Sequence, residues 1–571
     1  MKFLRLCLLL ALITMGANSV STNAEAITHL GERYVINVEE MDLDGDESLM
    51  DIIMMAPEFL SLDGKVTLGN YEVRIDNVYL GLDEEAFLYN TKAREVKEVS
   101  ICTFTSVSKG NDGVGGVIDV IYRNSVAQNK VALSGSTYGN GQLYTDLSHH
   151  FKDKRLTLAA TAVANTRYVK FAQDGGDITH RSFIENLRLT AKWRITDKDS
   201  LQVDFFQSFG NTKHRYHFAT PYSMTDYDRN VGIVFNYIHD INDAGNSIVA
   251  ETGVLYDNNQ ASLYKERNVN PYFVFEYNLP LFSQKAMVLL GTEHGYLNTW
   301  GDEVMRGQFL YDDLYVQFDY DHGPWLITLG DRYRHMNYWF KPYYPDVEKE
   351  LWHHNRGSHS YVASVGYRFN EKNLLQGSFA RKYFIPGFLG ELVGDVDDQG
   401  KTVYNPDYNT NVAYVSELAY TYQKKKFLFM TSINNANYLD DVLYGHRRIF
   451  AFRTSSTFST GILRLTAGVN YYHQYTQGVV PGAGYYQNYY SIKLLPSLSL
   501  SPCTRLSATM IYVSKRDEPL NLMLQMPNMY ASVRLSHYFS KRWNAFADFH
   551  DIAGQRMGNR ALTVGATFYP F

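Results

Sequence analysis

From about residue 130 to the end of the chain, polar and apolar residues alternate in segments of roughly ten residues. The segment 187–194 has Leu, Leu, Ala and Trp at one set of alternate positions and Arg, Thr, Lys and Arg at the other. The segments 201–205 and 313–320 alternate in the same way. Because successive side chains of a β-strand point to opposite faces, this period of two predicts strands with one apolar and one polar face.

The connections between these segments provide an independent check on the strand count, which we predict to be about 22. After every second strand the connection is short and rich in turn-forming residues. These short connections lie at 152–154, 196–199, 242–245, 321–324, 370–373, 424–426, 460–461, 501–504 and 540–542. The connections at the other strand ends include long ones, such as 338–357 and 384–409. This asymmetry predicts an all-β transmembrane β-barrel of antiparallel strands in a bacterial outer membrane, with both chain ends on the periplasmic side.

The two ends of the chain agree with export and with a closed barrel. Lys2 and Arg5 precede an apolar run, and residues 24–26 read Ala-Glu-Ala, which is a small-x-small cleavage pattern. Residues 1–26 are therefore predicted to be a secretory signal peptide. The last ten residues, 562–571, form an alternating segment that ends on Pro-Phe. We expect this strand to pair with the first one and close the barrel.

Composition distinguishes a barrel from other classes of protein. The chain has 45 tyrosines among 571 residues and a mean hydropathy of −0.29. It is too polar for a helical membrane protein, and tyrosine is the residue that forms girdles at bilayer interfaces. The formal net charge of −6 comes without a basic stripe, so nucleic acid is not an expected partner. A soluble β-sandwich stays as the alternative, although it seldom needs so many consecutive strands.

A barrel of this width has a lumen that is usually plugged, and residues 27–124 are the candidate plug. We expect a small α+β domain there, with a helix over 47–55 that Asp46 caps and Pro57 ends. The expected strands of the domain cover 34–38, 65–68, 72–75, 96–102 and 117–122. The predicted organisation is therefore a signal peptide (1–26), a plug (27–124) and an outer-membrane β-barrel (125–571).

Several blocks of this segment resemble the plug of TonB-dependent outer-membrane receptors. The blocks are DIIMMAP at 51–57, LDGKVTLGN at 62–70, VRIDNVY at 73–79, VKEV at 96–99 and GGVIDVIYR at 115–123. The resemblance implies a gated transporter, in which ligand binds to the external loops and the plug apex, and a periplasmic coupling protein pulls on the N-terminal segment. The sequence departs from the family pattern at Glu58-Phe59, where Gly-Val is usual, and at Asn77, which stands in place of a glycine. It also lacks an added N-terminal domain, so it resembles a short variant.

Two sets of residues are candidates for the steps that the resemblance implies. Aromatic and histidine side chains of the predicted loop 338–357 have ring faces that stack on a sugar or an aromatic ligand, although they can equally pack the loops together or lie in the interfacial girdle. This set is Tyr338, Trp339, Tyr343, Tyr344, Trp352, His353 and His354. The second set, predicted to be captured by the coupling protein as an added strand, is Ile27, Thr28, His29 and Leu30. Only about seven residues, 27–33, precede the first plug strand, so weak or lost coupling stays open.

Other motifs have simpler explanations. The run 42–46, Asp-Leu-Asp-Gly-Asp, begins like a calcium loop, but its glycine comes too early and the glutamate at the twelfth position is missing. The glycine-rich run 110–116 leads into a strand, so it offers no helix N-terminus to a phosphate. Adjacent histidines at 353–354 are more often polar surface than metal ligands. We therefore expect no catalytic residues, no cofactor and no bound metal, and we do not expect an enzyme.

These observations predict an outer-membrane receptor that imports a siderophore, cobalamin, glycan or peptide through a plugged barrel. The expected partners are outer-membrane lipid, a small extracellular ligand and a TonB-type coupling protein, with a surface lipoprotein as a further candidate. The alternative is a plugged barrel that has a binding or scaffolding role in an outer-membrane complex and is not energy coupled.

Overall fold

We describe the fold from a computed structural model of the chain. The residues that the structure describes are 34–38, 41, 47–57, 61–62, 65–66, 71–75, 78–79, 84–102, 116–123, 129–137, 140–151, 155–173, 176–217, 222–242, 245–260, 265–301, 305–342, 352–384, 411–424, 426–441, 445–477, 484–514, 528–550, 552 and 561–570. The predicted signal peptide, the candidate coupling segment Ile27 to Leu30 and the run 42–46 lie outside them.

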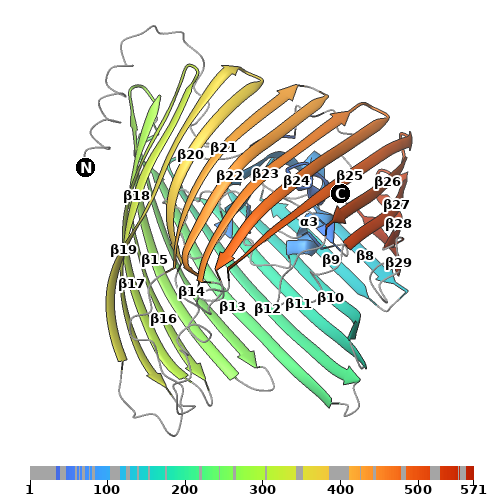
Figure 1. Cartoon of the computed structure of the whole chain (residues 1–571), viewed down its shortest axis with the longest axis horizontal. Helices are drawn as coiled ribbons and strands as arrows, with labels where there is room; N and C mark the ends of the chain where they lie inside the picture. The colour runs from blue at the N-terminus through green and yellow to red at the C-terminus, as the bar shows by residue number, and fades with distance from the viewer. Residues whose placement is uncertain are drawn as a thin grey trace.

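A closed barrel of 22 antiparallel strands makes up most of the molecule (Figure 1), which confirms the predicted fold class and strand count. Its strands are β8 (Lys130–Ser136), β9 (Gly141–His150), β10 (Leu156–Gln173), β11 (Gly176–Arg194), β12 (Asp199–His217), β13 (Tyr222–Asp240), β14 (Ser247–Gln260), β15 (Lys265–Leu281), β16 (Ala286–Gly301), β17 (Met305–His322), β18 (Trp325–Pro342), β19 (Trp352–Asn370), β20 (Asn373–Phe384), β21 (Asn411–Lys424), β22 (Phe427–Asp441), β23 (Gly445–Ser459), β24 (Leu463–Gln477), β25 (Gly484–Ser501), β26 (Thr504–Val513), β27 (Asn528–Ser540), β28 (Trp543–His550) and β29 (Ala561–Phe568).

The last strand closes the barrel on the first. β29 pairs antiparallel with β8, with Thr563 opposite Ser136 and Phe568 opposite Val131. Closure pairs the backbone groups that an edge strand would leave open, and an unpaired backbone group is costly in lipid. The expected role of the C-terminal strand is therefore confirmed.

The alternation predicted from the sequence separates the two surfaces of the wall. On β17, Leu314 and Val316 are 68% and 44% exposed on the outer face, whereas Asp313 and Tyr315 are each only 2% exposed on the inner face. On β11, Trp193 is exposed and Arg188 is buried. The outer surface is thus apolar where the chain alternates, as a lipid-facing wall requires, and the polar residues face the lumen.

Many strands are longer than predicted, and this corrects the loop assignments. β18 and β19 pair as far as Phe340 and Trp352, so 338–342 and 352–357 belong to strands and not to a long loop. Beyond the apolar band both faces of the wall carry polar residues, so the sequence stops alternating although backbone pairing continues. We call the end of the barrel with the short connections the turn end, and the opposite end the loop end.

The residues before the barrel form a small α+β unit. Its main sheet has the order β1-β6-β7-β4-β5, and β2-β3 is a separate hairpin. Its elements are β1 (Tyr34–Asn37), α2 (Leu49–Ile53), β2 (Ser61–Leu62), β3 (Lys65–Val66), β4 (Tyr71–Ile75), β5 (Val78–Tyr79), α3 (Glu84–Asn90), the 3₁₀ helix η1 (Ala93–Glu95), β6 (Val96–Cys102) and β7 (Gly116–Tyr122). The five predicted strands are present as β1, β3, β4, β6 and β7, whereas β2, β5 and helix α3 were not predicted.

Helix α2 covers 49–53 in place of the predicted 47–55, so it begins two residues later than predicted. Its N-cap is Ser48 and not Asp46: the Asp51 amide donates to Ser48 Oγ at 3.2 Å, and the Ser48 amide donates to Asp51 Oδ2 at 3.0 Å. This reciprocal capping box satisfies two amides that the first turn of a helix leaves without partners. The first turn of α2 is therefore set by Ser48 and Asp51.

The α+β unit lies inside the barrel (Figure 1). Ile36, Leu49 and Val99 of the unit belong to one buried hydrophobic cluster with Met430 of β22 and Ile511 of β26. Among the described residues, no helix is long and apolar enough to cross a membrane. The domain boundaries at residues 26 and 124 fall where the chain is not described, so they stay predictions.

Candidate functional site: the inner wall and its plug contacts

Of the seven candidate ligand residues predicted from the sequence, the structure describes the side chains of two. Trp339 and His353 occupy neighbouring strands and their rings stack, with centroids 5.2 Å apart and an interplanar angle of 24°. By the alternation of β18 and β19 both lie on the outer face of the wall. Tyr343 and Tyr344 lie outside the described residues, as do the side chains of Tyr338, Trp352 and His354.

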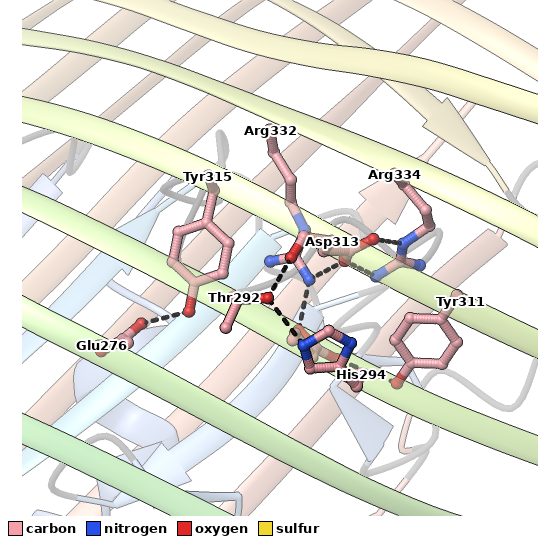
Figure 2. Close-up of polar contacts among 9 residues, drawn as sticks. Glu276, Thr292, His294, Tyr311, Asp313, Tyr315, Arg332 and Arg334 are labelled. Carbon is pink, nitrogen blue, oxygen red and sulfur yellow. Dashed lines mark hydrogen bonds and ion pairs between the residues drawn. The ribbon is translucent and has the colours of Figure 1, made fainter.

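A charged network covers the inner face of β16, β17 and β18 (Figure 2). Asp313 accepts a hydrogen bond from Arg332 Nε and another from Arg334 Nε, each at 2.6 Å. Nη2 of Arg332 pairs with both Asp313 and Glu293. Both arginines are almost fully buried. Because each guanidinium presents several donors in one plane, the two arginines and two acids form a rigid, well-paired group.

Tyrosines extend this network, and each lies on a glycine of the neighbouring strand. A Cβ built on Gly291 would lie 2.2 Å from the ring of Tyr315, and one on Gly295 would lie 2.2 Å from the ring of Tyr311. The Tyr315 hydroxyl donates to Glu276 at 2.9 Å (Figure 2). The Tyr311 hydroxyl donates to Glu293 Oε1 at 3.0 Å. Glycine at these positions provides the space in which a flat ring lies against the backbone.

The network joins three neighbouring strands, because its acids on β16 and β17 are paired with arginines of β18. His294 of β16 lies on the outer face, where it contacts Asp312 at 2.6 Å and Thr292 at 3.0 Å. Among the described residues, no group of three or more His, Cys, Asp or Glu is arranged to hold a metal ion. The sequence placed Asp313 and Tyr315 in the lumen, but it did not show that Arg332 and Arg334 lie opposite them.

A second set of polar contacts joins the α+β unit, which is called the plug from here on, to the inner wall at helix α2. Arg505 of β26 pairs with Glu47 at 3.1 Å, and Arg464 of β24 pairs with Glu47 at 3.4 Å and with Asp51 at 3.5 Å. Burial by itself raises the pKa of Asp51, but the Arg464 guanidinium and the hydrogen bonds from Ser48 outweigh it, so the pKa is lowered overall. Both carboxylates at the start of α2 are therefore held by arginines of the wall.

The other end of α2 is held by a buried lysine. Lys493 of β25 donates from Nζ to the carbonyl oxygen of Met54 at 2.7 Å and also to that of Ala56. Asn470 of β24 donates to the carbonyl oxygen of Pro57 at 2.7 Å. These carbonyls belong to the C-cap of α2 and to the residues just after it, so the side chains of the wall supply donors where the helix ends. Helix α2 is thus fixed at both ends to the strands β24 to β26.

The plug also contacts the first and last strands of the barrel. Glu95 of η1 pairs with Lys130 of β8 at 2.9 Å, and both side chains are buried. The guanidinium of Arg94 lies 4.6 Å from the ring centroid of Tyr569, directly after β29. A buried ion pair and a cation–π contact therefore meet at the seam where the barrel closes.

Comparisons with known proteins agree on the architecture. No model of a protein family matches the sequence, and no curated protein matches it. Solved structures match at low identity over nearly the whole chain. The closed form of the ferric-catecholate import receptor Fiu from E. coli K12 has a TM-score of 0.68 at 11% identity, with 94% of this chain and 96% of that chain covered. The siderophore receptor PiuA from Acinetobacter baumannii has a TM-score of 0.69 at 11% identity, with 96% and 99% covered.

The match extends to a protein with a different cargo. The copper transporter OprC has a TM-score of 0.71 at 9% identity, with 94% of this chain and 99% of that chain covered. This chain has the fold of the TonB-dependent outer-membrane receptors. The resemblance seen in the blocks between residues 51 and 123 is therefore confirmed for the fold. Because the matched proteins carry different cargoes, the shared fold does not identify a ligand for this chain.

Proposed function

We propose that this chain is an outer-membrane receptor that binds a small extracellular ligand and imports it to the periplasm. The observation that carries the proposal is the α+β unit held inside a closed barrel by contacts at both ends of helix α2. A barrel with this many strands leaves a wide lumen when it is empty. A plug held by ion pairs and hydrogen bonds closes the lumen and still permits a rearrangement that opens it.

The architecture of the plug suggests where a pull would act. Among the described strands, β1 lies at the edge of the plug sheet and pairs with β6 alone, through four residue pairs from Tyr34–Ile101 to Asn37–Glu98. We infer that a periplasmic coupling protein of the TonB type captures the segment 27–33 as an added strand. Tension on that segment would strip β1 from the sheet edge before it reached the better-paired interior strands. In this proposal the turn end of the barrel faces the periplasm and the loop end faces outward.

Two measurements test the proposal. Deleting residues 27–124 is expected to turn a closed protein into a large conductive pore in planar bilayers. Replacing Leu30 by Pro removes a main-chain donor from the captured segment, so uptake of ligand should stop while binding at the cell surface persists. A variant that carries Leu30→Ala retains the donor and serves as the matched control.

Two results would contradict the proposal. High conductance in the intact protein, unchanged by the deletion, would show that the α+β unit does not close the barrel. Uptake that persists in the Leu30→Pro variant and in cells without the coupling complex would favour the alternative role, a plugged barrel that binds or scaffolds without energy coupling.

A further inference from the structure

Basic side chains gather on the outer face of strands β11, β12, β13 and β15, which lie in one sector of the wall (Figure 1). The outer face is given by its exposed apolar residues: Leu189 of β11, Ile233 of β13 and Phe273 of β15 all have odd numbers. On β12 the outward numbers are odd as well, because Phe205 is opposite Leu189. The basic residues at odd positions of these strands form what we call the basic belt: Arg181, Lys213, Arg215, Arg229, Lys265 and Arg267.

The basic belt lies directly beyond the apolar band, on the side of the loop end. On β13 the outward apolar run ends at Val231, and the next outward residue is Arg229. On β11 the run ends at Phe183 and the next outward residue is Arg181, and β15 repeats this order. In a membrane barrel the end of the apolar band is the level at which lipid headgroups begin. Long basic side chains at this level can lie along the apolar surface and reach the headgroups.

Few acids offset the charge of the basic belt. Among the described outward side chains of β11 to β15, the acids are Asp199, at the turn end, and Glu185, which is four residues and about 13 Å along the strand from Arg181. Within the belt, Arg181 and Lys213 are directly opposite each other on neighbouring strands. Like charges in this arrangement repel and destabilise a sheet. An anion bound between them would relieve the repulsion.

Two arginines of the basic belt flank an amide. Asn258 of β14 is directly opposite Arg229 of β13 on one side and Arg267 of β15 on the other. Neighbouring strands are about 4.8 Å apart, so the two arginines start from backbone positions about 10 Å from each other. A guanidinium binds a phosphate through two parallel hydrogen bonds, and an amide both donates and accepts. The row therefore suits a headgroup in which phosphates are attached to a sugar that carries hydroxyl or amide groups.

The sector from β22 to β26 differs from the basic belt. Phe450 and Phe452 are exposed on β23, so its even-numbered residues face outward. Among the described outward positions of β22 to β26, the one lysine or arginine is Arg448 of β23. Its outward neighbours on the adjoining strands are Asn437 and Tyr475, so no second cation is opposite it. The charge density of the belt is therefore a local feature of the wall and not a property of its whole rim.

We propose that the basic belt binds the headgroup of a phosphorylated glycolipid in the outer leaflet of the outer membrane, with its acyl chains along the apolar wall. The arginines contact the phosphates, and Asn258 contacts the sugar between them. A phospholipid with one phosphate would occupy only part of the row. This proposal goes beyond the import of a ligand, and it takes from the proposed function only the orientation, in which the loop end faces outward.

The test uses the full-length protein, freed of lipid in a non-ionic detergent, and purified lipid A with two phosphates as the probe. Native mass spectrometry measures the affinity, and thermal unfolding measures the stabilisation that the lipid produces. The double variant Arg229→Gln/Arg267→Gln keeps polar, exposed side chains and removes two charges. Because each basic residue near an anionic lipid surface contributes about fivefold to the affinity, lipid A should bind this variant about thirtyfold more weakly. Dephosphorylated lipid A should bind the wild type weakly as well.

Two further variants separate lipid binding from a structural role. Arg448→Gln is the matched control, because it removes an exposed arginine of the outer face that lies outside the basic belt, and it should bind lipid A as the wild type does. Lys213→Gln ends the repulsion with Arg181, so without lipid its midpoint of thermal unfolding should equal or exceed that of the wild type. The rise in this midpoint that lipid A produces should be smaller than in the wild type. A purely structural role for Lys213 would instead lower the midpoint in the absence of lipid.

Two results would overturn the proposal. Equal losses of affinity in Arg448→Gln and in the double variant would show that lipid A responds to the total charge of the rim and not to the basic belt. Equal affinities of the wild type for lipid A and for phosphatidylglycerol would show that a single phosphate is sufficient, and the glycolipid assignment would be wrong. Because binding is measured without cargo or coupling protein, a chain that binds lipid A at the belt but imports nothing would retain this proposal and lose the proposed function.

Discussion

The contact between Lys493 and the end of helix α2 predicts how firmly the plug is held. Lys493 is almost fully buried and its ammonium donates to the carbonyl oxygens of Met54 and Ala56. Replacing it by Met retains an unbranched apolar side chain but removes the charge and both hydrogen bonds. A hydrogen bond to a charged group contributes about 1.5–3 kcal/mol, so the anchor should weaken by about 3 kcal/mol or more.

The assay is the frequency of plug opening in planar bilayers. A loss of about 3 kcal/mol corresponds to a rise of about a hundredfold in the ratio of open to closed states, because each 1.4 kcal/mol is tenfold. Resistance of the variant barrel to unfolding in SDS before heating is the control, since the substitution should leave the wall intact. Unchanged opening in an intact barrel would refute the argument that Lys493 holds the plug.

A neighbouring glycine provides a second route to the same contact. Gly468 lies opposite Lys493 on β24, and a Cβ placed there would lie 2.8 Å from Lys493 Cε. Gly468→Ala should therefore displace the lysine side chain and raise plug opening as well. In the double variant the two effects should not add, because the contact is already lost. Additive effects would show that Gly468 acts through the backbone of the wall, whose Thr454 carbonyl oxygen is 3.0 Å from the same Cβ position.

Two further predictions concern the wall and the acidic end of α2. Gly291→Ala should push the Tyr315 ring off the wall and lower the stability of the barrel by about 1–3 kcal/mol. Gly461→Ala is the control, because a Cβ at position 461 has no atom within 4 Å and should change the stability little. Thermal unfolding in detergent measures both variants. The pKa of Asp51 is lowered in the folded state, in part by Arg464. The ion pair therefore stabilises the closed plug fully above the ordinary pKa of aspartate, about 4, and this stabilisation is lost as the pH falls through the lowered pKa. Plug opening in the wild type should therefore rise at acidic pH. The Asp51→Asn variant should open more often than the wild type at neutral pH, and its opening frequency should rise less when the pH is lowered. An unaltered pH profile in that variant would contradict this assignment.

Some features of the site could be predicted from the sequence, whereas others depend on which strands pair and in which register. The polar face of 313–320 was correctly placed in the lumen, because facing is set by a period of two along a single strand. The network of Asp313 with Arg332 and Arg334 depends on the register of β17 against β18, which places Arg334 opposite Asp313. In the same way, the position of Arg181 opposite Lys213 on the outer wall follows from the pairing of β11 with β12.

Three local predictions failed or were missed, and each has a reason in the residues concerned. The turn between β15 and β16 was not recognised, because Phe282, Ser283 and Gln284 adopt positive φ without the Gly, Asn or Asp residues that usually mark it. Helix α3 is only seven residues long, too short to show a clear helical period. Helix α2 is capped by Ser48 and not by Asp46. Both residue types are good N-caps, so the sequence does not distinguish them, and the extended backbone at Ser48 decides which one caps the helix.

The sequence by itself determined the fold class, a count of about 22 strands and the ends at which the short turns lie, and it predicted a small α+β unit before the barrel. These features follow from signals carried within each short segment: alternation, turn residues and a handful of plug-like blocks. The tertiary structure decided how far the strands extend beyond the apolar band, which side chains meet on the inner wall and where the plug is fastened. Those contacts join residues hundreds of positions apart, such as Lys493 and Met54, and their geometry arises only when the barrel closes around the plug.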